Sequence, residues 1–276
     1  MFKDFRWRSG LLTGVVTVLA ANVIGLLLGF LAEALQGSVD EPVYDATIRA
    51  GNTGWTDVVE TITKMGNVPQ TQIWTAVLAL GLATWFFAKG WRWWIPLVVC
   101  PLAWIVGRWS QRVLAKIIDR DQDLISLIGT PIGNYPSGGC QRLIVVLGVA
   151  AFLVVHYART SRRTTVLLFS VVGVLGLVEA YARARLAQHW FTDIVGGVIF
   201  GWVLLVAIIL TIRAFDPDPP RPQPGREARA NRRAAGRSSE SAAVPRGTSG
   251  PAWRAKVERV RSRAARHERT GVAGEG

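Results

Sequence analysis

The first 215 residues alternate between long apolar runs and short polar segments. An α-helix needs about 20 apolar residues to cross a bilayer. The shorter runs, taken singly, would also fit buried helices of a soluble protein, but six such runs are difficult to place in one soluble core. The pattern therefore predicts an all-α, polytopic membrane protein with six transmembrane helices. The runs cover residues 11–31, 71–88, 93–107, 143–157, 164–178 and 194–212.

Charge is distributed unevenly among the segments that join these runs. One group is rich in Lys and Arg and nearly free of acidic residues: the N-terminus, "KGWR" and "ARTSRR". The other group mixes acidic and basic residues: 32–70, 108–142 and 179–193. Basic connecting segments of membrane proteins stay on the cytoplasmic side. We therefore expect a multi-pass protein of the cytoplasmic (inner) membrane, with both termini in the cytoplasm and the mixed group outside.

The first apolar run has a second interpretation as a signal peptide. "AEA" at residues 32–34 resembles a small-residue cleavage site. However, the apolar stretch is longer than the roughly 7–15 residues of a signal peptide, and its removal would leave five spans. We expect a retained helix.

Residues 55–66 have a different pattern from the spans. Val58, Val59, Ile62 and Met65 recur at helical spacing among polar residues. This spacing predicts a short amphipathic helix that lies on the outer face of the membrane.

Composition changes abruptly after residue 215. Residues 216–276 consist mainly of Arg, Ala, Ser, Gly and Pro, and they supply part of the net charge of +13. Such a composition is typical of disorder. Basic segments bind nucleic acid or anionic lipid headgroups, and beside a membrane the headgroups are the simpler partner. We expect a membrane domain at 1–215 and a largely disordered cytoplasmic tail at 216–276 that binds headgroups, with no nucleic-acid partner.

Residues suited to catalysis gather in the segments predicted to lie outside. Asp193 follows His189 by one helical turn, so its carboxylate can orient the imidazole and leave one ring nitrogen free as a nucleophile or base. Arg183 offers donors suited to phosphoryl oxygens, and Glu179 one turn earlier is placed to pair with it. "PSGG" at residues 136–139 precedes the fourth run.

Each of these features also has a structural interpretation. His189 beside Trp190 could anchor the chain at the membrane interface, Asp193 could be the N-cap of the last span, and Pro-Ser-Gly turns are common. The predicted topology places all of them on one side of the membrane without using any motif. That convergence favours a shared site.

This arrangement resembles the type 2 phosphatidic acid phosphatase (PAP2) superfamily, six-span lipid phosphatases with three sequence motifs. The third motif, Ser-Arg-x5-His-x3-Asp, is matched at the full spacing by Arg183, His189 and Asp193, with Ala182 in place of Ser. The resemblance covers roughly residues 10–213, and the tail lies outside it.

The other two motifs match less completely. The second, Pro-Ser-Gly-His, is matched at residues 136–138, but Gly139 stands where the family has His. The first, Lys-x6-Arg-Pro, is represented by Lys116 and Arg120, without the Arg-Pro pair.

The resemblance implies a role for each matched residue. His189 would be the nucleophile that forms a phosphohistidine, with Asp193 as its partner. A second group would bind the substrate phosphate: Lys116, Arg120, Ser137, Gly138 and Arg183. The Ser hydroxyl and the backbone N–H groups near the glycine can donate to phosphate.

No metal and no cofactor are expected. The family needs neither, and Cys100 and Cys140 lack the spacing of a metal site or of a disulfide framework. "DRDQD" at residues 119–123 resembles the start of a calcium-binding loop but lacks the Gly and the distal Glu, so we interpret it as a solvated turn.

The His missing at position 139 is the general acid that protonates the leaving group in the family. Loss of a positioned acid lowers a rate by about 10²–10⁴-fold. A diphosphate tolerates this loss, because its leaving group is a phosphate and already a stable anion. We expect an active enzyme to prefer polyprenyl or other lipid diphosphates to phosphatidate, unless Cys140 or Asp121 supplies the proton.

The leading prediction is an integral membrane lipid phosphatase that hydrolyses a lipid phosphate or polyprenyl diphosphate. The alternative is a catalytically impaired relative that binds lipid phosphates or acts as a scaffold. A small-molecule transporter ranks third, because transporters carry polar residues near the midplane and these spans are nearly free of charge. The Arg-rich, Lys-poor composition is typical of a GC-rich bacterial genome. The oligomeric state stays open.

Overall fold

Helices form nearly all of the chain that the structure describes. The structure is a computed structural model, and it describes residues 6–120, 123–217 and 258. Within these ranges, five helices are long and apolar enough to cross a membrane. They are α1 (Trp7–Ala34), α4 (Val68–Ala88), α6 (Gly138–Ala158), α7 (Arg162–Arg185) and α8 (Phe191–Phe215).

The sixth long helix is α5 (Trp94–Ile117), which has 24 residues. Its first half is apolar, whereas its second half carries Arg108, Arg112 and Lys116. These cations lower its mean hydropathy below that of the other spans. The prediction of an all-helical membrane protein is confirmed. Because five of these six long helices are apolar enough to cross a membrane, the sixth span stays a prediction.

Several helices extend beyond the apolar runs that predicted them. α5 continues from Gly107 to Ile117, and α7 continues from Val178 to Arg185. Backbone hydrogen bonding does not end where the side chains become polar. Segments expected in outer loops are therefore helical, and they hold Arg108 and Arg183 on rigid backbone.

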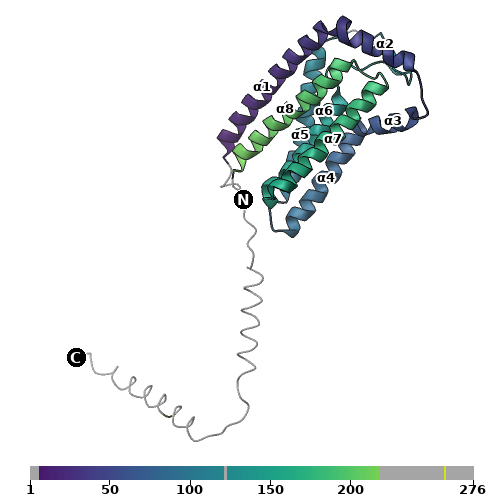
Figure 1. Cartoon of the computed structure of the whole chain (residues 1–276). Coiled ribbons are helices and arrows are strands. Elements are labelled where there is room, and N and C mark those ends of the chain that lie inside the picture. The colour runs from purple at the N-terminus through teal and green to yellow at the C-terminus, as the bar shows by residue number, and fades with distance from the viewer. Residues whose placement is uncertain (1–5, 121–122, 218–257, 259–276) are drawn as a thin grey trace. The chain divides into compact units, whose positions relative to one another are not determined.

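The helix α6 is the centre of the bundle and is buried along most of its length. Its neighbours are α4, α5, α7 and α8. α1 lies along α8 (Figure 1), where the Thr17 hydroxyl donates to the Ala207 carbonyl at 3.2 Å. α1 is thus packed as part of the bundle.

Short helices cover one end of the bundle. The predicted amphipathic helix is present as α3 (Thr56–Thr63), followed by a 3₁₀ turn at Lys64–Gly66. Val59 packs against α7, whereas Val58 is exposed. A further helix, α2 (Glu41–Ala50), follows a π-helical turn at Gln36–Asp40 and was not predicted.

The opposite end of the bundle is closed by the first residues after α8. Asp216 accepts a hydrogen bond from the Tyr157 hydroxyl at 2.6 Å and pairs with Arg92 at 2.9 Å. The His156 ring lies 2.9 Å from the Asp216 carbonyl. Apart from Asp216, Pro217 and Glu258, the predicted basic tail lies outside the described residues, and so does Asp121.

Candidate active site

Most of the predicted site residues meet at the end of the bundle where α7 finishes and α6 and α8 begin (Figure 1). Ser137 directly precedes α6, and Gly138 is its first residue. Arg183 lies in the last turn of α7, His189 in the loop that follows, and Asp193 in the first turn of α8. Residues separated by more than 50 positions in the chain are thus brought to one place by three helix ends.

Backbone hydrogen bonds join the loop before α6 to the loop before α8. The Ser137 N–H donates to the Asp193 carbonyl at 3.0 Å, and the Gly133 N–H donates to the Gln188 carbonyl at 2.7 Å. Gly133 and His189 also form an isolated β-bridge. The Pro-Ser-Gly-Gly turn and the histidine are therefore held in fixed register.

The Arg183 side chain is buried and fixed by protein acceptors. Its Nε donates to Glu179 Oε1 at 2.7 Å, which confirms the pair predicted from the one-turn spacing. Its Nη2 donates to Asn67 Oδ1 at 2.9 Å and to the Thr63 carbonyl at 3.3 Å. These contacts hold the guanidinium over Gly139.

The position of the guanidinium explains why residue 139 is a glycine. A Cβ atom added at Gly139 would overlap Arg183 Cζ, Nε and Nη2. Arg183 would then have to leave Glu179 and Asn67. Arg183 and any side chain at position 139, including the histidine of the family motif, therefore compete for the same space.

His189 is half-buried, and its ring lies directly against Gly133, where a Cβ would overlap the ring atoms. Its Nδ1 is buried and has no hydrogen-bond partner among the described residues. Burial lowers the pKa of His189 to about 3, and the cations Arg183 and Arg142 act in the same direction. The imidazole is therefore neutral at pH 7, the state that a nucleophile requires.

The neutral imidazole predicts a pH-dependent contribution to stability. In the unfolded chain a histidine has a pKa of about 6.5, so below that pH the unfolded state binds a proton that the folded state does not. His189 therefore stabilises the fold above pH 6.5, and this contribution falls as the pH drops toward 3. Thermal unfolding in detergent at pH 7.5 and pH 5 should show a smaller acid destabilisation for His189→Asn than for the wild type. An equal shift would contradict a neutral, buried imidazole.

Asp193 and Arg120 form a buried ion pair. Arg120 Nη1 donates to Asp193 Oδ1 at 2.6 Å, and its Nη2 donates to Asp40 Oδ2 at 2.6 Å. Gln36 and Thr192 accept its remaining donors. The Arg120 donors are thus used by protein groups, and Asp193 pairs with Arg120, so their roles as phosphate ligand and histidine partner stay predictions. The turn at residues 119–123 was expected to be solvated, but Arg120 within it is buried.

Lys116 lies apart from these buried groups. It occupies the last turn of α5 with its side chain exposed. Its expected role in phosphate binding also stays a prediction.

Sequence reasoning missed three polar side chains beside the Pro-Ser-Gly-Gly turn. Arg142 Nη1 and Arg108 Nη1 both donate to Gln111 Oε1, at 3.0 and 2.7 Å. One signal was available, because an arginine stands at the edge of an apolar run in both "GCQRL" and "IVGRW". Gln111 carried no such signal. The Asp40 carboxylate, which pairs with Arg120 away from this turn, was also missed and carried none.

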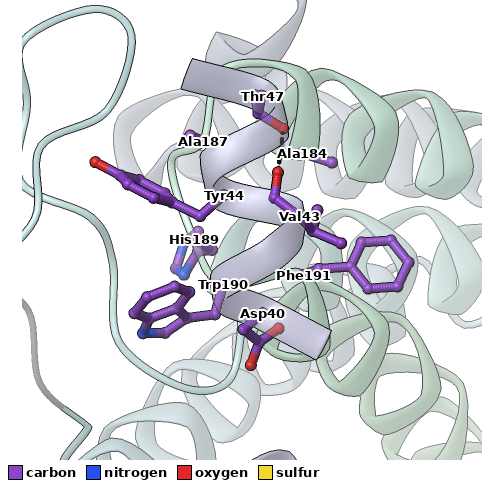
Figure 2. Close-up of a pocket in the computed structure, with 9 residues that line it drawn as sticks. All are labelled: Asp40, Val43, Tyr44, Thr47, Ala184, Ala187, His189, Trp190 and Phe191. Carbon is purple, nitrogen blue, oxygen red and sulfur yellow. Dashed lines mark hydrogen bonds between the residues drawn. The ribbon is translucent and has the colours of Figure 1, made fainter. Parts of the chain in front are cut away.

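A small cavity of about 10 Å³ reaches His189 from the side of α2. Figure 2 shows the lining of this cavity, which includes His189, Asp40 of the π-helical turn, and Val43, Tyr44 and Thr47 of α2. The Tyr44 hydroxyl donates to the Ile125 carbonyl at 2.8 Å and so ties α2 to the loop before α6. The cavity has room for about one water molecule.

Residues 122–216 match the model of the PAP2 superfamily. This part of the chain is similar to the PAP2 superfamily. This match confirms the resemblance found in the sequence. The matched residues include α6, α7, α8 and the loops that carry the candidate site.

One protein and one solved structure, both from Bacillus subtilis, show how far this similarity extends. Phosphatidylglycerophosphatase B of strain 168 is 23% identical over 180 residues, which cover 65% of this chain and 84% of that protein. A crystal structure of a transmembrane PAP2-type phosphatidylglycerolphosphate phosphatase superposes with a TM-score of 0.58 at 22% identity and covers 70% of this chain and 94% of that one. The structural match confirms the fold.

Proposed function

We propose that the protein is a membrane phosphatase that removes phosphate from a lipid phosphate or polyprenyl diphosphate, with His189 as the nucleophile. The observation that carries the proposal is a neutral imidazole beside buried arginines and the N-terminus of α6. A neutral ring nitrogen can attack phosphorus, while the guanidinium groups and the helix N-terminus favour the negatively charged phosphoryl group.

The proposed reaction has two steps. A ring nitrogen of His189 attacks phosphorus, the bond from phosphorus to the leaving oxygen breaks, and a phosphohistidine forms. Water then attacks the phosphohistidine, releases inorganic phosphate and regenerates the histidine, with the surplus proton passing to solvent. A lipid monophosphate leaves as an alkoxide that must be protonated, whereas a lipid diphosphate leaves as a lipid monophosphate that is already a stable anion.

The membrane orientation is part of this proposal. Lys89, Arg92, Arg159 and Arg162 belong to the connections at the bundle end opposite His189. The positive-inside rule assigns that end to the cytoplasm. The candidate site then faces the outer side of the inner membrane, and the basic tail at 216–276 binds anionic headgroups of the inner leaflet.

Phosphate release by the purified protein in detergent tests the function. Phosphatidylglycerophosphate, phosphatidate and a polyprenyl diphosphate are compared as substrates, and acid quenching with a radiolabelled substrate tests for an acid-labile phosphoenzyme. Turnover of at least one lipid with a labelled intermediate is expected. The absence of phosphate release from all three would contradict the proposal.

A second candidate function is favoured by Gly139, which removes the family's general acid. In that case the chain binds lipid phosphates without hydrolysing them. Binding of the same lipids without turnover would support this function in place of the first.

Restoring the family histidine is expected to impair the site. Gly139→His must displace the Arg183 guanidinium from Glu179 and Asn67, so we expect kcat/KM for lipid phosphates to fall by about 10²-fold. Gly54→His is the matched control, because nothing lies within 4 Å of a Cβ added at Gly54. Faster turnover of phosphatidate by Gly139→His would show instead that both side chains fit.

A further inference from the structure

Two guanidinium groups flank the two glycines of the Pro-Ser-Gly-Gly turn. A Cβ added at Gly139 would overlap Arg183, and one added at Gly138 would lie 2.5 Å from Arg142 Nη1. Arg183 belongs to the matched motif, whereas Arg142 does not. The N-terminus of α6 is thus enclosed by a cation on each side.

The partners of Arg142 are neutral. Its Nη1 donates to Gln111 Oε1 at 3.0 Å and its Nη2 to the Gly66 carbonyl at 2.9 Å. Its Nε is buried without a hydrogen-bond partner, and the whole residue is 5% exposed. Among the described residues Arg142 forms no ion pair, although buried charges are normally paired.

The groups around Arg142 add further positive charge near its side chain. Gln111 Oε1 also accepts from Arg108 Nη1 at 2.7 Å, so one neutral oxygen holds two cations together. Arg142 also folds back over the first residue of its own helix, where the helix dipole is positive and disfavours a cation. Like charges at a helix N-terminus become favourable when an anion binds between them.

In the described part of the chain, Arg183 and Arg120 differ from Arg142 in that each forms an ion pair with a carboxylate. Arg183 pairs with Glu179, and Arg120 pairs with both Asp40 and Asp193. Arg142 and Arg108, in contrast, share Gln111. Two guanidinium groups without an ion-pair partner among the described residues therefore lie near Gly138, and the acidic side chain whose charge acts on Arg142 is Glu179, the partner of Arg183.

The field of Arg142 reaches the proposed nucleophile. Arg142 and Arg183 are the cations that act on the His189 ring. A phosphoryl group attacked by His189 and held by Arg183 would therefore also experience Arg142. Because Arg142 and Arg183 lie against the adjacent residues Gly138 and Gly139, anions bound by the two guanidinium groups would be neighbours.

We propose that Arg142, held with Arg108 by Gln111, forms a second phosphoryl subsite that receives the leaving phosphate of a lipid diphosphate. The inference rests on the proposed function and names its substrate class. When the P–O bond to the attacked phosphorus breaks, the electron pair stays on the bridging oxygen of the departing lipid monophosphate, and the guanidinium groups stabilise that charge. A positive charge thus does here what proton donation does in the family, which explains how position 139 can be a glycine.

The subsite predicts a substrate-dependent loss of activity. Full-length protein in detergent is assayed with a polyprenyl diphosphate and with the polyprenyl monophosphate of the same chain length. Arg142→Gln should lower kcat/KM for the diphosphate by about 10²-fold and lower that for the monophosphate by much less. Arg142→Lys, which keeps the charge, should recover part of the diphosphate activity, and Arg108→Gln should show a smaller loss in the same direction.

Arg112→Gln is the matched control, because Arg112 lies one turn after Arg108 on α5 with an exposed side chain. It should leave the ratio of the two activities unchanged. Equal losses on both substrates for Arg142→Gln, with no recovery by Arg142→Lys, would overturn the subsite.

A binding measurement separates the subsite from the proposed function. His189→Ala protein is heated with inorganic pyrophosphate or inorganic phosphate, and pyrophosphate should raise its Tm more. The difference should disappear in His189→Ala/Arg142→Gln and persist in His189→Ala/Arg112→Gln. If the wild type hydrolysed no lipid phosphate but this difference were present, the proposed function would fail and the subsite would stand. If lipid phosphates were hydrolysed but pyrophosphate and phosphate stabilised equally, the subsite would fail alone.

Discussion

His189→Ala is expected to lower kcat/KM for any lipid phosphate by about 10⁴-fold or more, because the variant lacks the proposed nucleophile. The loss should appear in kcat, since the arginines proposed to bind phosphate remain. The acid-labile phosphoenzyme should disappear together with steady-state turnover. Phosphate release and quenched single-turnover reactions measure the two effects independently.

His156→Ala is the control for this prediction. His156 is half-buried at the other end of the bundle, beside the Asp216 carbonyl, and its removal should leave the activity per folded molecule close to that of the wild type. Turnover by His189→Ala within about tenfold of the wild type would exclude a phosphohistidine at this position. A loss in both histidine variants that follows their unfolding would point to stability as the cause.

The fold was predictable because its determinants are local in the sequence. Apolar runs give the number of spans, and the helical spacing of Val59 and Ile62 gives α3. The pair between Glu179 and Arg183 was predictable for the same reason, because residues one turn apart on a helix are neighbours. α2 was missed because residues 41–50 combine a proline, two acids and few large apolar residues.

Only the site residues that belong to a motif of known spacing were predictable from the sequence. His189, Arg183, Ser137 and Gly138 were found in this way, and the structure brings them together. The Arg142 contacts with Gln111 and Gly66 depend on how α5 and α6 pack, and no sequence spacing encodes that packing. A charged residue at the edge of an apolar run was the available clue, but such residues usually lie at the membrane surface.

The ion pairs of Arg120 show a further limit of sequence analysis. The motif resemblance assigns Arg120 to phosphate, whereas the structure surrounds it with Asp40 and Asp193. Asp40 lies 80 positions away in the chain, in a π-helical turn that no periodicity predicts. The tertiary fold therefore determines which anionic group the motif arginine contacts.

Arg120→Met is expected to destabilise the protein by about 3–5 kcal/mol, because it leaves two carboxylates buried without their cation. Asp40 and Asp193 are each 0% exposed, and both accept from Arg120 at 2.6 Å. A loss of that size should lower Tm in detergent by about 10 °C. Thermal unfolding followed by tryptophan fluorescence measures it.

Two further variants test the cause of this destabilisation. Arg120→Met/Asp40→Asn should recover part of the loss, since one of the two unpaired charges is removed. Arg49→Met is the matched control on α2, where the exposed Arg49 donates only to the Asp45 carbonyl among the described groups, and it should change Tm by little. A loss below about 1 kcal/mol for Arg120→Met would mean that water or a rearrangement compensates the carboxylates.

The same variant decides between the two roles of Arg120. If it mainly holds Asp193 in the first turn of α8, the activity per folded molecule should fall modestly and recover with the stability in Arg120→Met/Asp40→Asn. If Arg120 releases Asp193 during the reaction and binds the phosphoryl group, KM for a lipid phosphate should rise and stay high in the double variant. In that second case Asp193, four residues after His189, becomes free to orient the imidazole, so one exchange of partners would complete the family's catalytic arrangement.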